Sequence, residues 1–296
     1  MLELRGLTKR FGRLTAVDDL TIDISPGRVT GFLGPNGAGK TTTLRMALGL
    51  VKPTAGTATF DGKTYRQLAI PMRQVGASLE ATSFHPGRTA LNHLLTLAPP
   101  ARVPDSRCMQ VLEFVGLGPG AKRRVGQFSL GMRARLSLAS ALLGDPPTLL
   151  LDEPVNGLDP EGIAWMRRML RALAAEGRTV LISSHLLSEV YQTADDVVIL
   201  SRGRAVYTGS LVDLESSGQR VTVVSTPDPP AFARLAARLG WQLAGHPEGY
   251  AVSGPTAAEI GDAAAGAGIV LHQLATRSDS LETAFLALTE GQGSIR

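Results

Sequence analysis

The sequence predicts an α/β fold with a helical insertion, followed by a small α+β unit. A glycine-rich loop at residues 34–42 stands between an apolar run and a segment typical of a helix. Further along, short apolar runs alternate with segments of helical periodicity, a pattern typical of a parallel sheet covered by helices. Near residue 215 the composition changes. We therefore expect one domain over residues 1–215 and a smaller one over residues 216–296.

Length and composition indicate a globular chain with a sizeable core, since 44% of its 296 residues are apolar. The net charge of +4 is too small to indicate nucleic acid as a partner. Cys108 is the single cysteine, so no internal disulfide forms and a reducing compartment is expected. No run approaches the ~18 apolar residues of a membrane span, and the N-terminus lacks a signal peptide's apolar core. We expect a soluble chain that reaches a membrane only through a partner.

The segment before the loop is expected to form antiparallel strands over residues 2–30. Apolar and polar residues alternate there, the apolar positions being Leu2, Leu4, Leu7, Leu20, Ile22 and Ile24. Such alternation is typical of strands with one buried face.

The loop itself predicts a nucleoside triphosphate site with Mg²⁺. It fits G-x-x-x-x-G-K-[ST] and reads Gly34, Pro35, Asn36, Gly37, Ala38, Gly39, Lys40, Thr41 and Thr42. The glycines let backbone N–H groups turn inward around anionic oxygens. Lys40 is expected at the β- and γ-phosphates, and the Thr41 hydroxyl at the Mg²⁺. An apolar strand over residues 29–33 precedes the loop, and a helix whose N-terminus faces the phosphates follows it.

Helical periodicity predicts a helical insertion over about residues 86–145, interrupted by the glycine-rich segment 116–120. Strands are then expected at residues 148–151, 179–182 and 197–200, separated by helices at residues 161–175 and 186–193. Together with the triphosphate-binding loop at residues 34–42, these elements predict a P-loop ATPase core with antiparallel strands at its N-terminus and a helical insertion.

A buried strand that ends in Asp152 and Glu153 predicts the second half of the triphosphate site. At the carboxyl edge of a parallel sheet, Asp152 can hold Mg²⁺ opposite Thr41. Glu153 can accept a proton from the water that attacks the γ-phosphate. A structural strand cap is the alternative interpretation of the same two residues.

Three further motifs carry a family resemblance, and they occur in the order Asp152-Glu153-Pro154, Gly157-Leu158-Asp159-Pro160 and Ser183-Ser184-His185. Together with the loop they resemble the ATP-binding subunit of ABC transporters over residues 1 to about 215. The resemblance implies that Asp159 lies in the loop that crosses a dimer interface. It also implies that His185 hydrogen-bonds the γ-phosphate as a switch.

The family's signature L-S-G-G-Q is only partly matched here. Residues 128–132 read F-S-L-G-M, so Ser129 and Gly131 match while Leu130 and Met132 depart. A hydroxyl and a close backbone N–H at a helix N-terminus form an anion site, which in the family binds the γ-phosphate held by the other protomer. The alternative is an ordinary helix start.

Two more positions are assigned by the resemblance. Glu80 stands where the family has a glutamine that touches Mg²⁺, and similar glutamate versions occur in ATPases of antibiotic and lantibiotic exporters. Its alternative is a surface carboxylate. Phe11 stands where the family has an aromatic ring stacked on adenine; its alternative is a core phenylalanine.

Beyond a linker at residues 215–219, the sequence predicts a ferredoxin-like βαββαβ unit. We expect the following elements in order: a strand at 221–225, a helix at 229–239, strands at 241–244 and 249–253, a helix at 256–266, a strand at 269–275 and a closing helix at 280–289. This unit could stabilise a dimer, bind a regulator, or pack as an appendage.

The resemblance implies an ATP-hydrolysing subunit that powers a separate membrane permease from the cytoplasmic face of the cell membrane. Two copies would close around two ATP molecules with Mg²⁺, and residues 80–89 would receive a helix of the permease. We expect export of a drug, antibiotic or other small amphiphile, with neither nucleic-acid binding nor direct bilayer insertion.

Two other functions are less consistent with the chain. A soluble ABC-type switch acting on the ribosome carries two ATPase halves, and this chain has room for one; its DNA-acting counterpart has a long coiled coil, and no sustained heptad lies within residues 42–127. A nucleotide-binding module without turnover would lack the catalytic carboxylate, whereas Glu153 is present.

Overall fold

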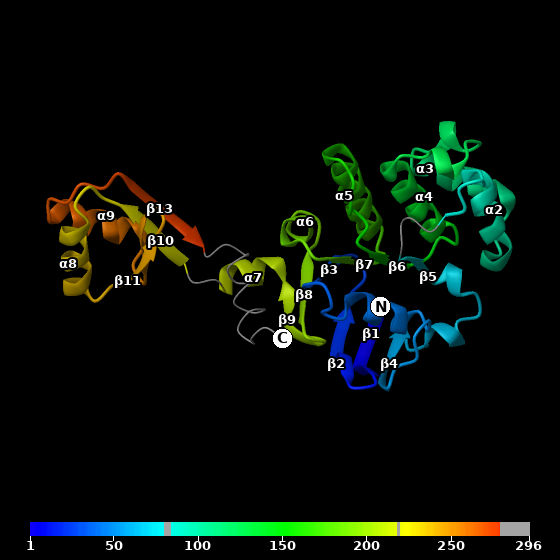
Figure 1. Ribbon diagram of the computed structural model, residues 1–296, viewed down its shortest axis with the longest axis horizontal. Coiled ribbons are helices and arrows are strands. Elements are labelled where there is room, and N and C mark those ends of the chain that lie inside the picture. The colour runs from blue at the N-terminus through cyan, green and yellow to red at the C-terminus, as the bar shows by residue number, and fades with distance from the viewer. Residues whose placement is uncertain (80–83, 218–219, 279–296) are drawn as a thin grey trace. The chain divides into compact units, whose positions relative to one another are not determined.

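The computed structural model describes residues 1–79, 84–217 and 220–278 (Figure 1). Contacts between residues divide the chain into two compact units, Met1–Leu211 and Val212–Arg296. The first unit contains two sheets and the second unit one, and each unit has its own apolar cluster. Glu80 and the closing helix expected at residues 280–289 lie outside the described residues.

A six-stranded sheet forms the centre of the first unit. Its spatial order is β5 (Val75–Ser78), β6 (Thr148–Asp152), β7 (Thr179–Ser184), β3 (Val29–Leu33), β8 (Asp196–Ser201) and β9 (Arg204–Ser210). The first five strands are parallel, and β9 runs antiparallel to β8. All residues of β3, β6 and β7 are buried, as expected of parallel strands covered on both faces. The predicted strands at 148–151, 179–182 and 197–200 are confirmed.

A second, antiparallel sheet packs against the first and confirms the strands predicted near the N-terminus. Its order is β2 (Leu14–Ile24), β1 (Leu2–Phe11) and β4 (Ala55–Phe60). The alternating apolar residues of β1 and β2 pair across the sheet, as Leu2 with Ile24 and Leu4 with Ile22. One buried cluster joins both sheets to helix α1 (Lys40–Ala47), and it includes Leu4, Ile22, Phe32, Leu44, Leu150 and Leu181.

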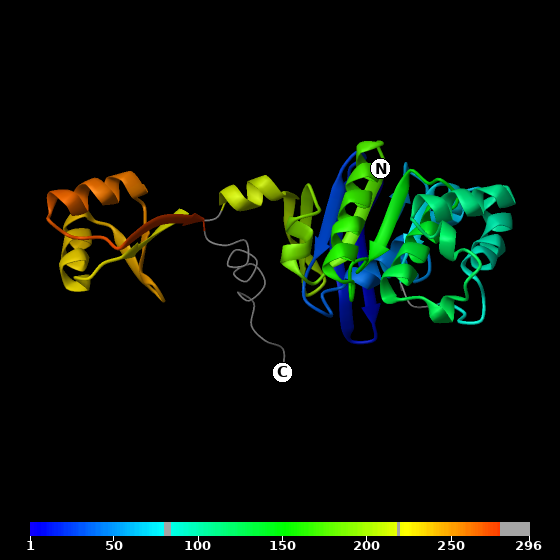
Figure 2. The same ribbon diagram turned by 90° about the horizontal axis from the view of Figure 1, so that it is seen from above.

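The predicted helical insertion is present and groups at the β5 end of the six-stranded sheet (Figures 1 and 2). Its main helices are α2 (Ala90–Ala101), α3 (Asp105–Phe114) and α4 (Leu130–Leu142). The expected interruption at residues 116–120 separates α3 from α4. Two further helices, α5 (Pro160–Ala175) and α6 (Leu187–Tyr191), connect the parallel strands where helices at 161–175 and 186–193 were expected.

The second unit has the expected βαββαβ order. Its elements are β10 (Arg220–Ser225), α8 (Pro229–Leu239), β11 (Gln242–His246), β12 (Gly249–Ser253), α9 (Ala257–Gly266) and β13 (Gln273–Ser278). The antiparallel sheet has the order β11-β12-β10-β13, which is that of a ferredoxin-like fold. Phe232 and Ile260 of the helices pack on Val224 and Val252 of the sheet.

Two boundaries differ from those predicted near this unit. The last strand was expected from residue 269, but β13 begins at Gln273, because Gln273 pairs with Ser225, where the partner strand β10 ends. The expected linker at residues 215–219 is in part helical, since α7 (Leu211–Ser217) extends to Ser217.

The first prediction concerns the close approach between β3 and α6. A Cβ added at Gly31 would lie 2.1 Å from Cγ1 of Val190. We expect Gly31→Ala to lower the free energy of unfolding by about 1–3 kcal/mol, the usual cost of overpacking. In a Val190→Ala background the same substitution should cost far less, because the clashing methyl group is gone. Urea unfolding of the four proteins measures both costs.

Gly245→Ala is the matched control, because a Cβ at this strand position meets nothing within 4 Å. An equal loss from Gly31→Ala in both backgrounds would show that the contact with Val190 does not require the glycine.

Candidate functional site

Three neighbouring parallel strands end at one edge of the six-stranded sheet and carry the residues that the motifs singled out. β3 leads into the loop at residues 34–39, β6 ends at Asp152, and β7 ends at Ser184 just before His185. β7 lies between β6 and β3. The crevice beyond the carboxyl ends of such strands is where α/β sheets bind ligands.

The loop requires its glycines because other backbone segments approach it closely. A Cβ on Gly34 would lie 2.5 Å from the carbonyl oxygen of Leu200. A Cβ on Gly39 would lie 2.5 Å from that of Ala16, and Gly39 also has a φ of +106°. Ala38 is buried and Thr42 is half-buried, whereas the tip of the loop is exposed and consists of Pro35, Asn36 and Gly37.

Lys40 is buried within the loop, with 6% of its surface exposed. Its ammonium donates hydrogen bonds to the carbonyl oxygens of Gly34 at 2.6 Å and Pro35 at 3.3 Å. It also lies 3.9 Å from Oε1 of Glu153. Burial lowers the pKa of Lys40, and the carboxylates of Glu153 and Asp152 partly oppose this shift. An anionic ligand at the loop would therefore stabilise the charged form of Lys40.

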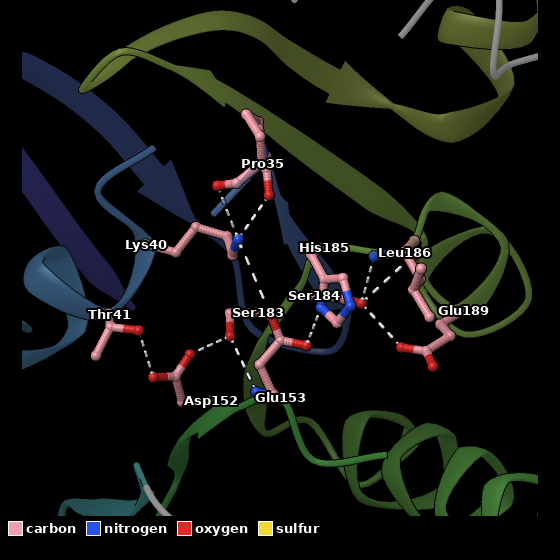
Figure 3. Close-up of polar contacts among 11 residues, drawn as sticks. Pro35, Lys40, Thr41, Asp152, Glu153, Ser183, Ser184, His185, Leu186 and Glu189 are labelled. Carbon is pink, nitrogen blue, oxygen red and sulfur yellow. Dashed lines mark hydrogen bonds and ion pairs between the residues drawn. The ribbon is translucent and has the colours of Figure 1, made fainter. Parts of the chain in front are cut away.

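Thr41 and Asp152 meet at the start of α1. The hydroxyl of Thr41 donates a hydrogen bond to Oδ2 of Asp152 at 2.7 Å, and the hydroxyl of Ser183 donates to Oδ1 (Figure 3). Hydroxyl and carboxylate oxygens are the ligands that Mg²⁺ prefers, with water completing its shell. Their proximity allows both side chains to ligate one ion, so these residues fit a Mg²⁺ site.

Glu153 and His185 form a pair beside Lys40 (Figure 3). Nδ1 of His185 lies 2.9 Å from Oε2 of Glu153. Because an ionised carboxylate only accepts hydrogen bonds, Nδ1 carries the proton of this bond and donates it. Nε2 is then available to another group.

Ser184 and Glu189 fix the turn that carries His185. The Ser184 hydroxyl donates a hydrogen bond to Oε2 of Glu189 at 2.8 Å and accepts one from the backbone N–H of Leu186 at 3.0 Å. Sequence reasoning assigned no role to Ser183, Ser184 or Glu189. The sequence feature that could have indicated a role for the two serines is their position directly before His185, at the end of a buried strand.

Ser129, Gly131 and Asp159 lie apart from this assembly. Ser129 caps α4 by accepting a hydrogen bond from Met132 N–H at 3.2 Å. Asp159 caps α5 by accepting one from Gly162 N–H at 2.8 Å. Among the described residues, no hydrogen bond joins any of the three to the loop at residues 34–42. Within one chain, Ser129 and Asp159 therefore act as the N-caps of α4 and α5.

Phe11 lies at the end of β1 and is 50% exposed, so it is not a core residue. The ammonium of Lys9 lies 4.8 Å from the centre of its ring. The ring therefore offers an exposed π-face on which a base could stack.

Comparison with known proteins identifies the family of the first unit. The model of the family described as ABC transporter matches residues 17–156. The bacitracin transport ATP-binding protein BcrA of Bacillus licheniformis is 44% identical over 207 residues, which cover 69% of this chain and 68% of that protein. The lantibiotic transport ATP-binding protein SrtF of Streptococcus pyogenes is 37% identical over 214 residues, which cover 71% and 93%. The chain belongs to the ATP-binding subunits of ABC transporters.

Solved structures agree with this assignment. An ATP-binding subunit of an ABC transporter superposes with a TM-score of 0.66 at 27% identity, covering 73% of this chain and 92% of that one. The dimeric post-hydrolysis state of the ATP-binding cassette MJ0796, bound to ADP and Pi, gives a TM-score of 0.64 at 26% identity, covering 71% and 99%. The predicted ABC ATPase fold and ATP-hydrolysing activity are thereby confirmed.

Residues 219–282 match a separate family, described as a domain of unknown function (DUF8746). Within residues 1–79, 84–217 and 220–278, no helix has the length and apolar character needed to cross a membrane.

The position of Glu153 makes the second prediction. We expect Glu153→Gln to slow ATP hydrolysis by roughly 10²–10⁴-fold, the usual contribution of a general base. Binding of a fluorescent ATP analogue should persist, because the loop and Lys40 are unchanged. Glu176→Gln is the control, since Glu176 pairs with Arg178 rather than with a site residue. Normal hydrolysis by Glu153→Gln would contradict the assignment of Glu153 as the base.

Proposed function

We propose that this ABC ATPase subunit uses ATP with Mg²⁺ to power a separate membrane permease that exports an antibiotic or a similar small amphiphile. The observation that carries the proposal is the joint presence of Lys40, Asp152, Glu153 and His185 at one sheet edge. The named relatives are ATP-binding proteins of bacitracin transport and of lantibiotic transport, and they support this class of substrate.

In this proposal each residue at the sheet edge has a separate role in ATP binding or hydrolysis. Loop N–H groups and Lys40 bind the phosphates, and the exposed ring of Phe11 stacks on adenine. Thr41 and Asp152 would hold Mg²⁺, which when bound would neutralise charge on the phosphate oxygens. Glu153 accepts the proton of the attacking water, and His185 forms a hydrogen bond with the γ-phosphate. Glu80 is proposed as a further Mg²⁺ ligand.

A second copy of the chain completes the site in this proposal. Ser129 and Asp159 are exposed at helix starts, with Gly131 in the first turn of α4. A helix N-terminus attracts anions, so Ser129 and Gly131 of one copy are proposed to bind the γ-phosphate held by the other. The dimeric form of the MJ0796 cassette supports this arrangement.

The remaining assignments concern domains and location. We propose that residues 1–215 are the ATPase domain and residues 216–296 an accessory domain. The permease is proposed to bind beside the helical insertion, through the segment at residues 80–89, and to hold the subunit at the cytoplasmic face of the cell membrane.

The proposed dimer makes the third prediction. Full-length Glu153→Gln should elute as a dimer with ATP and as a monomer without it, because bound ATP that is not hydrolysed keeps the two copies together. Size-exclusion chromatography with light scattering measures this. Adding Gly131→Asp should abolish the dimer, since a carboxylate there would repel the γ-phosphate of the other copy. A dimer that forms equally without ATP would contradict the proposal.

The proposed permease makes the fourth prediction. Affinity purification of the tagged chain from membranes of its native cells should recover a membrane protein with several spanning segments, identified by mass spectrometry. An untagged culture treated identically controls for adventitious capture. Recovery of ribosomal or DNA-associated proteins without a membrane chain would instead favour the soluble switch.

A further inference from the structure

The hydroxyl of Ser183 lies at the centre of the site, although no function described so far uses it. Ser183 is fully buried in β7, with 0% of its surface exposed, and it stands opposite Asp152 of β6 in the parallel register. Its hydroxyl donates a hydrogen bond to Oδ1 of Asp152 and accepts one from the backbone N–H of Glu153 at 3.0 Å (Figure 3). The hydroxyl oxygen of Ser183 therefore contacts two consecutive residues, Asp152 and Glu153.

The first contact fixes the orientation of a carboxylate. Oδ2 of Asp152 accepts a hydrogen bond from Thr41 at 2.7 Å, and Oδ1 accepts the one from Ser183. Because both of its oxygens accept a hydrogen bond, the Asp152 carboxylate is restrained from rotating about its Cβ–Cγ bond. Residues that hydrogen-bond a metal ligand in this way determine how well it binds the ion.

The second contact holds the backbone of the proposed base. Glu153 has a φ of +49°, in the left-handed region that residues other than glycine seldom adopt. Its N–H is directed at Ser183, lying 3.2 Å from the carbonyl oxygen and 3.0 Å from the hydroxyl. These contacts stabilise the strained turn that directs the Glu153 carboxylate toward Lys40 and His185.

We propose that Ser183 is a positioning residue that orients Asp152 for Mg²⁺ and holds Glu153 in its strained turn. One hydroxyl thereby couples the metal site to the catalytic base. The proposal rests on the Mg²⁺ site at Thr41 and Asp152 proposed above.

Removal of the Ser183 hydroxyl is expected to weaken ion binding, whereas a conservative replacement that keeps a hydroxyl is not. Ser183→Ala frees one oxygen of Asp152, so the affinity for the divalent ion should fall about 10-fold, within the usual range for residues that hold a metal ligand. Hydrolysis should also slow, because Glu153 loses one of its two anchors. Ser183→Thr keeps the hydroxyl and should bind the ion nearly as tightly as the wild type.

The experiment measures Mn²⁺ binding by electron paramagnetic resonance, on the full-length chain saturated with a non-hydrolysable ATP analogue. Thr179→Val is the matched control: it removes a buried hydroxyl from the other end of the same strand. Binding of a fluorescent ATP analogue in EDTA checks that each variant is folded, and we expect it to be unchanged.

Weaker Mn²⁺ binding in Ser183→Ala, with near-normal binding in Ser183→Thr and Thr179→Val, would support the proposal. Equal affinity in Ser183→Ala and the wild type would overturn it while leaving the Mg²⁺ site intact. Equal loss in Ser183→Ala and Ser183→Thr would also overturn it, because strand packing rather than the hydroxyl would then be responsible. A wild-type chain without nucleotide-dependent Mn²⁺ binding would overturn the Mg²⁺ site itself.

Discussion

The site depends on the parallel alignment of β6, β7 and β3. Because these neighbouring strands run in one direction, the loop, Asp152 and His185 reach the same edge of the sheet. The register pairs Asp152 with Ser183, and Leu33 with Ser184. A shift of one residue between β6 and β7 would turn the side chain of Asp152 toward the opposite face. Burial of all three strands on both faces makes such a shift costly, since apolar residues would have to repack.

The charges at this edge favour binding of a triphosphate together with a divalent cation, as proposed above for ATP and Mg²⁺. Two carboxylates, Asp152 and Glu153, lie near a single buried cation, Lys40. A polyphosphate that approached alone would meet Lys40 but would also be repelled by both carboxylates. A divalent cation held by Asp152 would offset its repulsion of the phosphates. The half-buried position of the site strengthens each interaction, because fewer water molecules screen it.

The sequence was sufficient for the parts of the fold and site that follow from local pattern. Apolar alternation predicted β1 and β2, and the glycine-rich motif predicted the loop before α1. Other features depend on distant contacts. β4 begins with Ala55 and Gly56 and exposes its first three residues, so it carries little strand signal. The two partners of Ser183 are Asp152, the last residue of β6, and Glu153 directly after it, at 31 and 30 residues' distance in sequence. The sheet register brings them together.

The proposed contribution of a second copy also has a physical basis within one chain. Leu130, a departure from the family signature, packs over Gly157, where a Cβ would lie 2.4 Å from Cδ2 of Leu130. Gly157 has a φ of +73°, so both conformation and space favour glycine at that position. The contact joins the start of α4, which carries Ser129, to the loop that leads to Asp159. The segments that carry Ser129 and Asp159 therefore pack against each other within one chain. A surface that is preorganised in this way loses less conformational entropy on association. Leu130 replaces a glycine of the family pattern, and in this chain its side chain packs the start of α4 against the loop at Gly157.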